Sequence, residues 1–321
     1  MDGPLKSLLM LTVCAVALVP ESGCKMFEPR TPPPVLPAVL PPNASLQQVI
    51  GAVNNNSMRI QSFATHDAEL SGPGMPVKLK GTKIVFDRPK RLRIQAGTGF
   101  GTEVDVGSNN ELFWFWVRRN EPPAVFFCRH DQYANCQAAQ EMPIEPGWLI
   151  EALGIVEFHP HEHHDGPRRR PDGRLEVMTT RQTVCGPARK MTVIEPSTAA
   201  VVEQHLYDQQ GRVTASAVVR EHRLDPHSGL VMPKVVDLQS GRAQFSMRVD
   251  LGRVTVNVPP SNPDALWAMP AIAGSPLIDL ADPAWQQNYA GQAPPQPTHR
   301  PAPQQEYTPT AGPARGYNRL R

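Results

Sequence analysis

The chain has 321 residues, of which 40 % are apolar and 19 % are charged, and its formal net charge is +2. The apolar share allows a packed core, which excludes disorder of the whole chain. The near balance of charge argues against a nucleic-acid-binding protein, because such a protein needs a concentrated basic surface. Proline is in excess, with 36 residues, and 15 of them lie in two segments near the ends.

The first 24 residues are typical of a secretory signal. The apolar run Ser7–Val19 is too short to span a bilayer, and two small residues precede Cys24. This order resembles the lipobox of bacterial lipoproteins, in which the cysteine becomes the lipidated N-terminus, but Glu21 stands where the lipobox normally has leucine. We expect lipidation at Cys24 and a membrane-anchored lipoprotein of the bacterial cell envelope that faces the periplasm. Lys25 is compatible with transfer to the outer membrane, and ordinary cleavage with an unmodified Cys24 is the alternative.

Two proline-rich segments flank the middle of the chain. Residues 25–44 hold seven prolines, which lack backbone donors and favour an extended polyproline II spacer. Residues 281–321 hold eight prolines with several glutamines, and such a composition cannot bury enough apolar surface to fold. The sequence therefore predicts a signal peptide over 1–24, a linker over 25–44, one domain over 45–280 and a disordered tail over 281–321.

A helix begins the predicted domain. Ser45 and Gln48 have the spacing of a capping box, in which each residue satisfies a free backbone group of the other. Apolar residues follow at helical spacing up to Val53. We expect this helix to run from about 46 to 56 and to end in the run Asn54–Asn56.

After this helix the apolar pattern changes to a period of two, which is typical of strands. One segment, 142–154, interrupts the strands with a helical pattern. About twelve strands with short connections predict a mainly β fold with a few helices (α+β), a curved antiparallel meander that forms an unclosed half-barrel with a helical lid. The predicted strands lie near residues 59–70, 76–87, 91–96, 102–106, 111–119, 123–129, 174–181, 189–195, 200–207, 212–222, 230–238 and 243–257.

Two segments of this meander resemble the LolA/LolB family of lipoprotein carriers and receptors. GTKIVFDRPKRLRIQAG, at 81–97, has a glycine-containing strand, the turn Arg88-Pro89 and an alternating strand. GSNNELFWFWVRRNEPP, at 107–123, has an asparagine turn before an aromatic strand. The resemblance implies an unclosed barrel with a helical lid and an apolar cavity. It also implies that this cavity binds acyl chains of lipoproteins or lipids without covalent chemistry.

The aromatic run at 113–116 is the clearest candidate for such a cavity. Alternation along a strand puts its aromatic side chains on both faces of the sheet, so the pattern is compatible with either face lining the cavity. Plain core packing is the alternative interpretation. The predicted lipid-cavity residues are Phe86, Leu92, Ile94, Leu112, Trp114 and Trp116 as walls and Trp148 and Leu149 as lid.

A histidine-rich segment, FHPHEHHDG, provides weak candidates for metal ligands. In extended backbone His159, His161 and His163 share one side, and neutral imidazoles bind zinc, nickel or copper. Pro160 and the arginine run that follows favour a mobile surface loop at 159–173 instead, and this loop departs from the carrier family. We therefore expect neither a metal nor another cofactor.

Two cysteines of the predicted domain are close in sequence. Cys128 and Cys136 are eight residues apart and would close a small disulfide loop in an oxidising compartment. Two unpaired thiols are the alternative. Neither cysteine is accompanied by the base and the oxyanion donors that a catalytic thiol needs.

No motif for nucleophilic, metal-assisted or nucleotide chemistry accompanies these features, so we expect a protein that is not an enzyme. Its expected partners are the acyl chains of lipids or lipoproteins, together with the membrane that holds its N-terminal anchor, and we expect a monomer that binds no nucleic acid. Two alternatives stay open. One is a structural or protein-interaction module of the envelope without a ligand, and the other is a metal-binding envelope protein that uses the loop His159–His164.

Overall fold

The computed structural model describes residues 39–73, 75, 77–121, 123–133, 146–183, 186–225, 228–241, 245–260 and 262–284. These residues all belong to one compact unit that begins at Ala38. The predicted signal segment 1–24, most of the predicted spacer and the tail beyond residue 284 lie outside the described residues. Among the helices described, none is long and apolar enough to cross a membrane.

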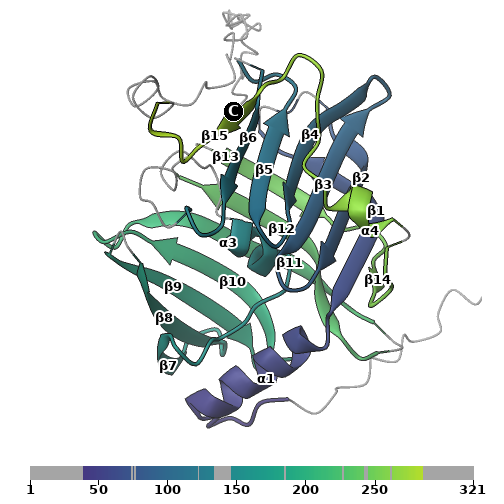
Figure 1. Ribbon diagram of the computed structural model, residues 1–321. Helices are drawn as coiled ribbons and strands as arrows, with labels where there is room; N and C mark the ends of the chain where they lie inside the picture. Colours follow the sequence, from purple (N-terminus) through teal and green to yellow (C-terminus); the bar gives the residue numbers. More distant parts are fainter. Residues whose placement is uncertain are drawn as a thin grey trace, which may run out of the picture. The chain divides into compact units, whose positions relative to one another are not determined.

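The first half of the unit is a run of strands that lie side by side in the order of the sequence (Figure 1). Its strands are β1 (Ser62–Ser71), β2 (Leu79–Asp87), β3 (Arg91–Thr98), β4 (Gly101–Ser108), β5 (Leu112–Val117) and β6 (Val125–Arg129). A short strand from the end of the described chain, β15 (Leu277–Asp279), pairs in parallel with β6 and extends this half by one strand.

The second half continues the same sheet from the other side of β1. Its strands are β7 (His163–Arg169), β8 (Leu175–Thr183), β9 (Gly186–Glu195), β10 (Ala200–Tyr207), β11 (Val213–Leu224), β12 (Val231–Ser240), β13 (Phe245–Asp250) and β14 (Thr255–Val256). β13 and β14 both pair with β1, so the first strand in sequence lies in the middle of the sheet. The 15-stranded order runs from β15 to β7, and no pairing among the described strands joins these two ends. The predicted mainly β, unclosed half-barrel is confirmed.

The two halves are joined at β1 by few pairs. Glu69, Leu70 and Ser71 face Asp250, Val249 and Arg248 of β13, whereas β1 pairs with β2 from Ser62 to Leu70. The stretch of β1 before Ala68 pairs with the two-residue β14 instead. β1 therefore divides its second edge between two partners, and the seam between the halves is short.

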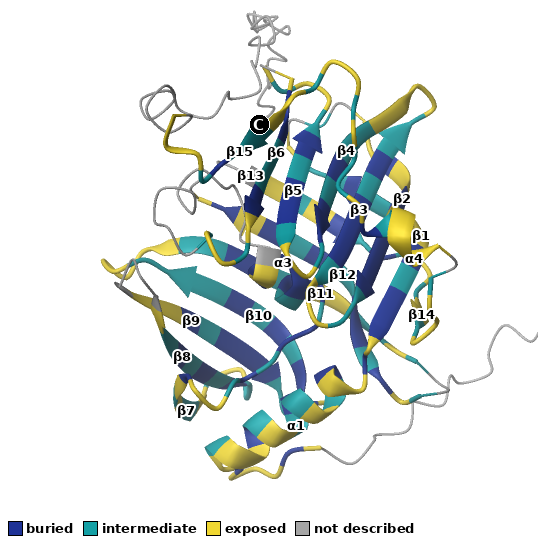
Figure 2. Cartoon of the chain, in the orientation of Figure 1, coloured by how far each residue is buried: buried dark blue, intermediate teal, exposed yellow. Residues whose placement is uncertain are grey.

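The main apolar core lies on the concave face of this sheet (Figure 2). Ile94 of β3 lies opposite Ile84 and Val106, and Val236 of β12 lies opposite Val249. Directly opposite residues of antiparallel strands share a face, so these side chains point the same way. Residues of β1–β4 and of β11–β13 belong to one buried cluster together with the helix α3 (Pro146–Ala152).

The first helix, α1 (Leu46–Met58), has the predicted capping box, since both hydrogen bonds between Ser45 and Gln48 are present. Val49 and Val53 pack against Leu175, Val177 and Ile194 of the second half, so α1 covers one end of the concave face. The prediction that the run Asn54–Asn56 ends this helix is wrong. The reason is tertiary: the Asn54 side chain bonds the backbone of Phe158, and that of Asn56 bonds the backbone of Val231.

Two further predictions about elements need correction. The segment 159–173 is not a loop throughout, because His163–Arg169 forms β7 and pairs with β8. The predicted strand 243–257 ends at Asp250, where Gly252 takes φ +53° against Asp67, and only the pair Thr255–Val256 resumes strand pairing. The predicted helix 142–154 is present as α3, and residues 142–145 lie outside the described residues.

Candidate functional site

The helix α3 occupies the concave face as part of the core. Its side chains Trp148, Leu149 and Ile150 are buried in the same cluster as Phe86 and Leu92. Figure 1 shows the helix between the strands of the first half and those of the second. The segment predicted as a lid therefore packs into the half-barrel.

The structure divides the predicted cavity residues between two faces. Phe86, Leu92 and Ile94 meet Trp148 and Leu149 on the concave face. Trp114 lies opposite Gly107 and next to Arg93 on the other face of the sheet, and Leu112 and Trp116 share its cluster. A single cavity cannot be lined by both sets, because successive side chains of a strand point to opposite faces.

The outer face that carries Trp114 is covered by a strap formed by residues 262–276. The strap begins with the short helix α4 (Pro263–Leu266), and its residues Met269 and Ile272 pack on the tryptophan cluster. The Trp116 indole donates to Ser275 Oγ at 3.0 Å.

A buried ion pair holds this strap to the sheet. Arg93 lies 2.7 Å from Asp105, and both side chains are almost inaccessible to solvent. Arg93 also donates to the carbonyl oxygens of Leu266 and Ala268, and the Trp114 indole donates to the other oxygen of Asp105. The strap thus closes the outer aromatic face, and its carbonyl oxygens at Leu266 and Ala268 accept hydrogen bonds from Arg93.

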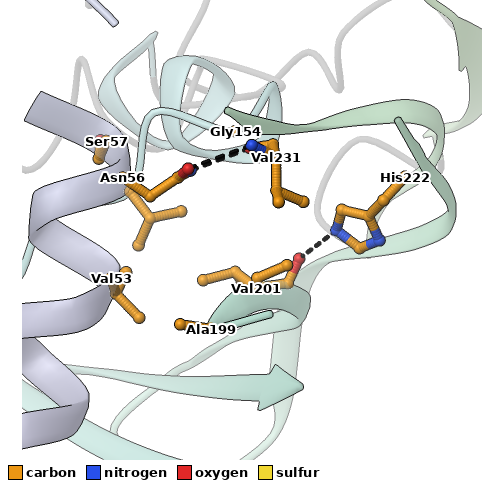
Figure 3. A pocket seen from close by; sticks show the side chains of 10 residues that line it. Val53, Asn56, Ser57, Gly154, Ala199, Val201, His222 and Val231 are labelled. Atoms are coloured by element: carbon orange, nitrogen blue, oxygen red, sulfur yellow. Dashed lines mark hydrogen bonds between the residues drawn. The ribbon is translucent and has the colours of Figure 1, made fainter. Parts of the chain in front are cut away.

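α3 fills the concave face between the described strands of the two halves, and the cavity described beside α1 is small. The cavity in Figure 3 lies between α1, the segment after α3 and β10, and has a volume of only about 20 Å³. This is about the space that one water needs. Asn56 bonds Val231 beside it, and the His222 ring bonds the Val201 carbonyl oxygen at 3.0 Å. Acyl binding on the concave face therefore requires α3 to move.

A larger open groove, of about 350 Å³, lies on the outer face of the second half and has polar walls. Glu176 and Met178 on β8 alternate with Leu175 and Val177, which face α1, so the groove is on the side away from the core. An exposed ion pair between Arg168 and Asp165 stands at this groove. Charged side chains, those of Asp165, Arg168, Glu176 and Arg189, line this groove, whereas apolar side chains line the concave face.

Polar side chains form a belt on the concave face of β8–β10, beyond the residues that pack under α1. Lys190 of β9 lies opposite Thr179 and Leu206, and its ammonium is 2.5 Å from the Glu151 carboxylate of α3. The side chains are only 8 % and 14 % exposed. Gln204 donates to the backbone carbonyl of Glu151 at 3.1 Å. The helix is therefore held by a buried ion pair as well as by apolar packing.

A second carboxylate lies near Lys190. The Glu162 side chain is 1 % exposed and accepts a hydrogen bond from Arg181 at 2.6 Å. Burial opposes ionisation of this group, but the hydrogen bond and the positive charges of Arg181 and Lys190 outweigh it, so the pKa of Glu162 lies below its usual value. Glu162 therefore stays ionised at neutral pH and is paired with Arg181.

Several buried polar atoms of this region have no hydrogen-bond partner among the described residues. They are Trp148 Nε1 on α3 and Glu162 Oε2, Thr192 Oγ1 and Gln204 Oε1 around the belt. Buried polar groups are normally satisfied, so a cluster of exceptions marks a place with capacity for further hydrogen bonds. The sequence analysis did not identify Lys190 or Glu151 as site residues, although each is a charged residue beside apolar ones.

The histidine side chains of segment 159–164 lie in two different places. The rings of His159 and His161 stack at 5.4 Å, and the His164 ring bonds Thr179 Oγ1 and the His159 carbonyl. His163 lies on the opposite, outer side at the polar groove. Within the described part of the chain, no group of three or more His, Cys, Asp or Glu residues could hold a metal ion. Of the predicted ligands, His159 and His161 lie side by side, whereas His163 lies apart from them on the outer side.

Cys128 is buried and forms no disulfide with another described residue. Burial and the nearby carboxylates Asp279 and Asp131 raise the pKa of this thiol to about 11, so it is protonated and a poor nucleophile at neutral pH. Cys136 lies outside the described residues, and the pairing of Cys128 with Cys136 stays a prediction.

No family model matches the sequence, and no curated protein matches it either. Solved structures that are similar include a DUF1329 family protein from Desulfovibrio piger, a putative outer membrane lipoprotein-sorting protein domain from Vibrio parahaemolyticus and a LolA superfamily protein from Nitrosomonas europaea. Their sequence identities are 12 %, 9 % and 9 %, and their TM-scores are 0.43, 0.46 and 0.42. The matches cover 68 % of this chain and 97 %, 98 % and 97 % of the three structures.

These structures include a LolA superfamily protein and a putative lipoprotein-sorting protein domain, the kinds of protein that the sequence resembles. At TM-scores below 0.5 they carry no argument about the function of this chain.

Proposed function

We propose that this protein is a non-catalytic carrier that binds acyl chains of lipids or lipoproteins on the concave face of its open sheet. The strongest support is that a short helix, and not further strands, covers the concave face. A continuous apolar surface, with Phe86, Leu92 and Ile94, is covered by the two-turn helix α3 and not by further strands. Such a surface can bury either the apolar side chains of α3 or an acyl chain.

The free energy of replacing α3 by an acyl chain on the concave face favours this proposal. Each buried methylene of an acyl chain contributes about 0.8 kcal/mol, so a long chain offsets the loss of contacts made by Trp148, Leu149 and Ile150. α3 has seven residues, and isolated helices shorter than about 12 residues are marginal in water. No strand pairing of the described sheet involves α3, so the helix can leave without breaking a ladder.

The sequence signals at the N-terminus support a location in the bacterial envelope. In the proposal Cys24 carries the lipid anchor, and the proline-rich residues 25–37 hold the monomeric body away from the membrane surface on its periplasmic side. The rest of the predicted linker belongs to the body, because Leu40 and Ala44 are buried in the cluster under α1. The prolines resist compaction, so the concave face stays accessible to lipid in the aqueous space.

The test is native mass spectrometry of the full chain with Cys24→Ser, purified from a bacterial host and also incubated with oleate. The substitution removes the predicted lipidation site, so any lipid detected is held without a covalent bond. We expect mass additions that match lipids and disappear on denaturation. A full chain that carries no lipid and takes up no oleate would overturn the proposal.

A pair of variants separates acyl binding from nonspecific stickiness. Leu149→Ser weakens the hold of α3 on the concave face and should raise lipid occupancy. Phe100→Ser removes an apolar side chain that is 90 % exposed, far from this core, and should leave occupancy unchanged. Equal effects of both substitutions would contradict binding on the concave face.

A further inference from the structure

The order of apolar and charged side chains on α3 indicates which kind of ligand could take its place. The helix presents Trp148, Leu149 and Ile150 to the apolar core, and directly after them the single carboxylate Glu151 to Lys190. An apolar stretch that ends in one carboxylate has the composition of a long-chain carboxylic acid. The helix thus occupies the concave face as an anionic amphiphile would.

Lys190 is placed to detect such an anion. It lies on the concave face because its opposite neighbour Leu206 packs on the main core, and Glu151 is its ion-pair partner there. Withdrawal of α3 removes Glu151 and leaves the Lys190 ammonium without its partner. A ligand that refills the concave face buries this ammonium again, and an uncompensated buried charge is strongly destabilising, so a ligand that brings an anion to this position is favoured.

The neighbouring charges do not supply that anion. Glu162 is the other buried carboxylate described near Lys190, and its Oε1 is already bonded to Arg181. While α3 is in place, the charge of Lys190 is compensated by Glu151 and the charge of Arg181 by Glu162. When α3 leaves, the described side chains Lys190, Arg181 and Glu162 together keep one net positive charge, which a single anionic group neutralises.

The unsatisfied polar atoms are consistent with a headgroup position at this belt. Thr192 lies two residues from Lys190 on the same face of β9, and Gln204 lies opposite Thr192 on β10. Thr192 Oγ1 has no hydrogen-bond partner among the described residues, and Gln204 Nε2 loses its acceptor, the Glu151 carbonyl oxygen, when α3 leaves. A hydroxyl can donate to a carboxylate, and a charge-assisted bond of this kind is stronger than one between neutral groups.

We infer that the concave face selects amphiphiles with one carboxylate at the end of the acyl chain, and that Lys190 binds this carboxylate in the place of Glu151. The inference rests on the proposed function, because it names the ligand class of the same face. Glu151 acts as an internal substitute for the ligand and keeps the face closed while no ligand is present.

The test compares laurate with 1-dodecanol, which has a chain of the same length and no charge, on the full chain with Cys24→Ser. Binding is measured by displacement of the neutral fluorescent probe N-phenyl-1-naphthylamine. We expect laurate to bind about tenfold more tightly than dodecanol, the effect of one charge-assisted contact. Glu151→Gln should tighten laurate binding further, because it frees Lys190 of its competitor.

The double variant Lys190→Gln with Glu151→Gln removes both charges and leaves no unpaired one. It should bind laurate and dodecanol equally. The matched control is the exposed pair Lys234 and Glu221, 2.8 Å apart, whose double Gln variant should keep the preference for laurate.

The outcomes separate this inference from the proposed function. Tight binding of both ligands without a preference in the unsubstituted protein, or a preference that survives in the Lys190→Gln, Glu151→Gln variant, overturns the inference and leaves acyl binding intact. Failure of the unsubstituted protein and of every variant to bind the probe or either ligand overturns the proposed function and this inference with it.

Discussion

Two half-buried imidazoles make the fold sensitive to mild acid. Burial lowers the pKa of His222 and of His130 below the ordinary value of 6.5, although each ring bonds a backbone carbonyl that partly opposes the shift. The unfolded chain therefore binds protons at a higher pH than the folded chain does. The stability from these neutral rings is complete above pH 6.5 and is lost progressively as the pH falls below that value.

We predict that His222→Gln reduces this pH dependence. In the unsubstituted protein the free energy of unfolding should fall between pH 7.5 and pH 5.5, and in the variant it should fall less, because one neutral ring no longer has to be protonated on acidification. Urea unfolding at both pH values measures the difference. The same slope in both proteins would show that His222 does not contribute.

A second prediction at the residue scale concerns Gly107, which leaves room for the ring of Trp114. A Cβ at Gly107 would lie 2.1 Å from an atom of this ring, and the indole is fixed by its bond to Asp105. Gly107→Ala should lower the free energy of unfolding by about 1–3 kcal/mol, the cost of overpacking. Gly99→Ala is the control, since nothing lies within 4 Å of its Cβ, and a loss of stability there as large as at Gly107 would contradict the prediction.

At the scale of elements, the exposed Gly51 lowers the stability of the helix α1. No atom lies within 4 Å of a Cβ added there, and glycine inside a helix is less stable than alanine. We predict that Gly51→Ala raises the free energy of unfolding by about 0.5–1 kcal/mol. Thermal unfolding followed by circular dichroism measures the gain, and a loss of stability would mean that α1 needs the flexibility of glycine.

The elements also show what local sequence could and could not predict. The strand at Ala200–Tyr207 and the capping box of α1 follow from alternation and from side-chain chemistry within a few residues. The extension of α1 through Asn54–Asn56 depends on contacts with Phe158 and Val231, more than 100 positions away. β7, with its histidines, arginines and proline, has no strand pattern and forms because β8 provides a partner.

For the candidate site, the sequence predicts which residues share a face of the sheet but not which face is concave. Alternation correctly separates Ile94 from Arg93 and Trp114 from Phe113, but a period of two has no information on which face becomes concave. That choice depends on the curvature of the whole sheet and on the strap over Trp114. The pair of Lys190 and Glu151 joins two elements through tertiary packing, so neither residue had a local signal of the other.

At the scale of the whole molecule, we predict that α3 opens independently of the sheet. The amides of Leu153 and Gly154, bonded to Leu149 and Glu151, should exchange hydrogen at least about tenfold faster than that of Val236 in β12. Leu149→Ser should accelerate exchange in α3 and leave Val236 unchanged. Hydrogen exchange resolved by residue measures this, and equal rates for α3 and β12 would mean that the helix opens only when the whole protein unfolds.

The short seam at β1 has a consequence for how the protein folds. Glu69 and Asp250, which join the two halves of the sheet, are about 180 positions apart, and contacts between such distant residues form late because a long loop must close first. The hairpins of β2–β6 and of β8–β12 join neighbours in sequence and can form earlier. A chain that is cut before β13 keeps an unpaired edge on β1, so nascent or truncated forms should aggregate through that strand until the last part of the sheet arrives.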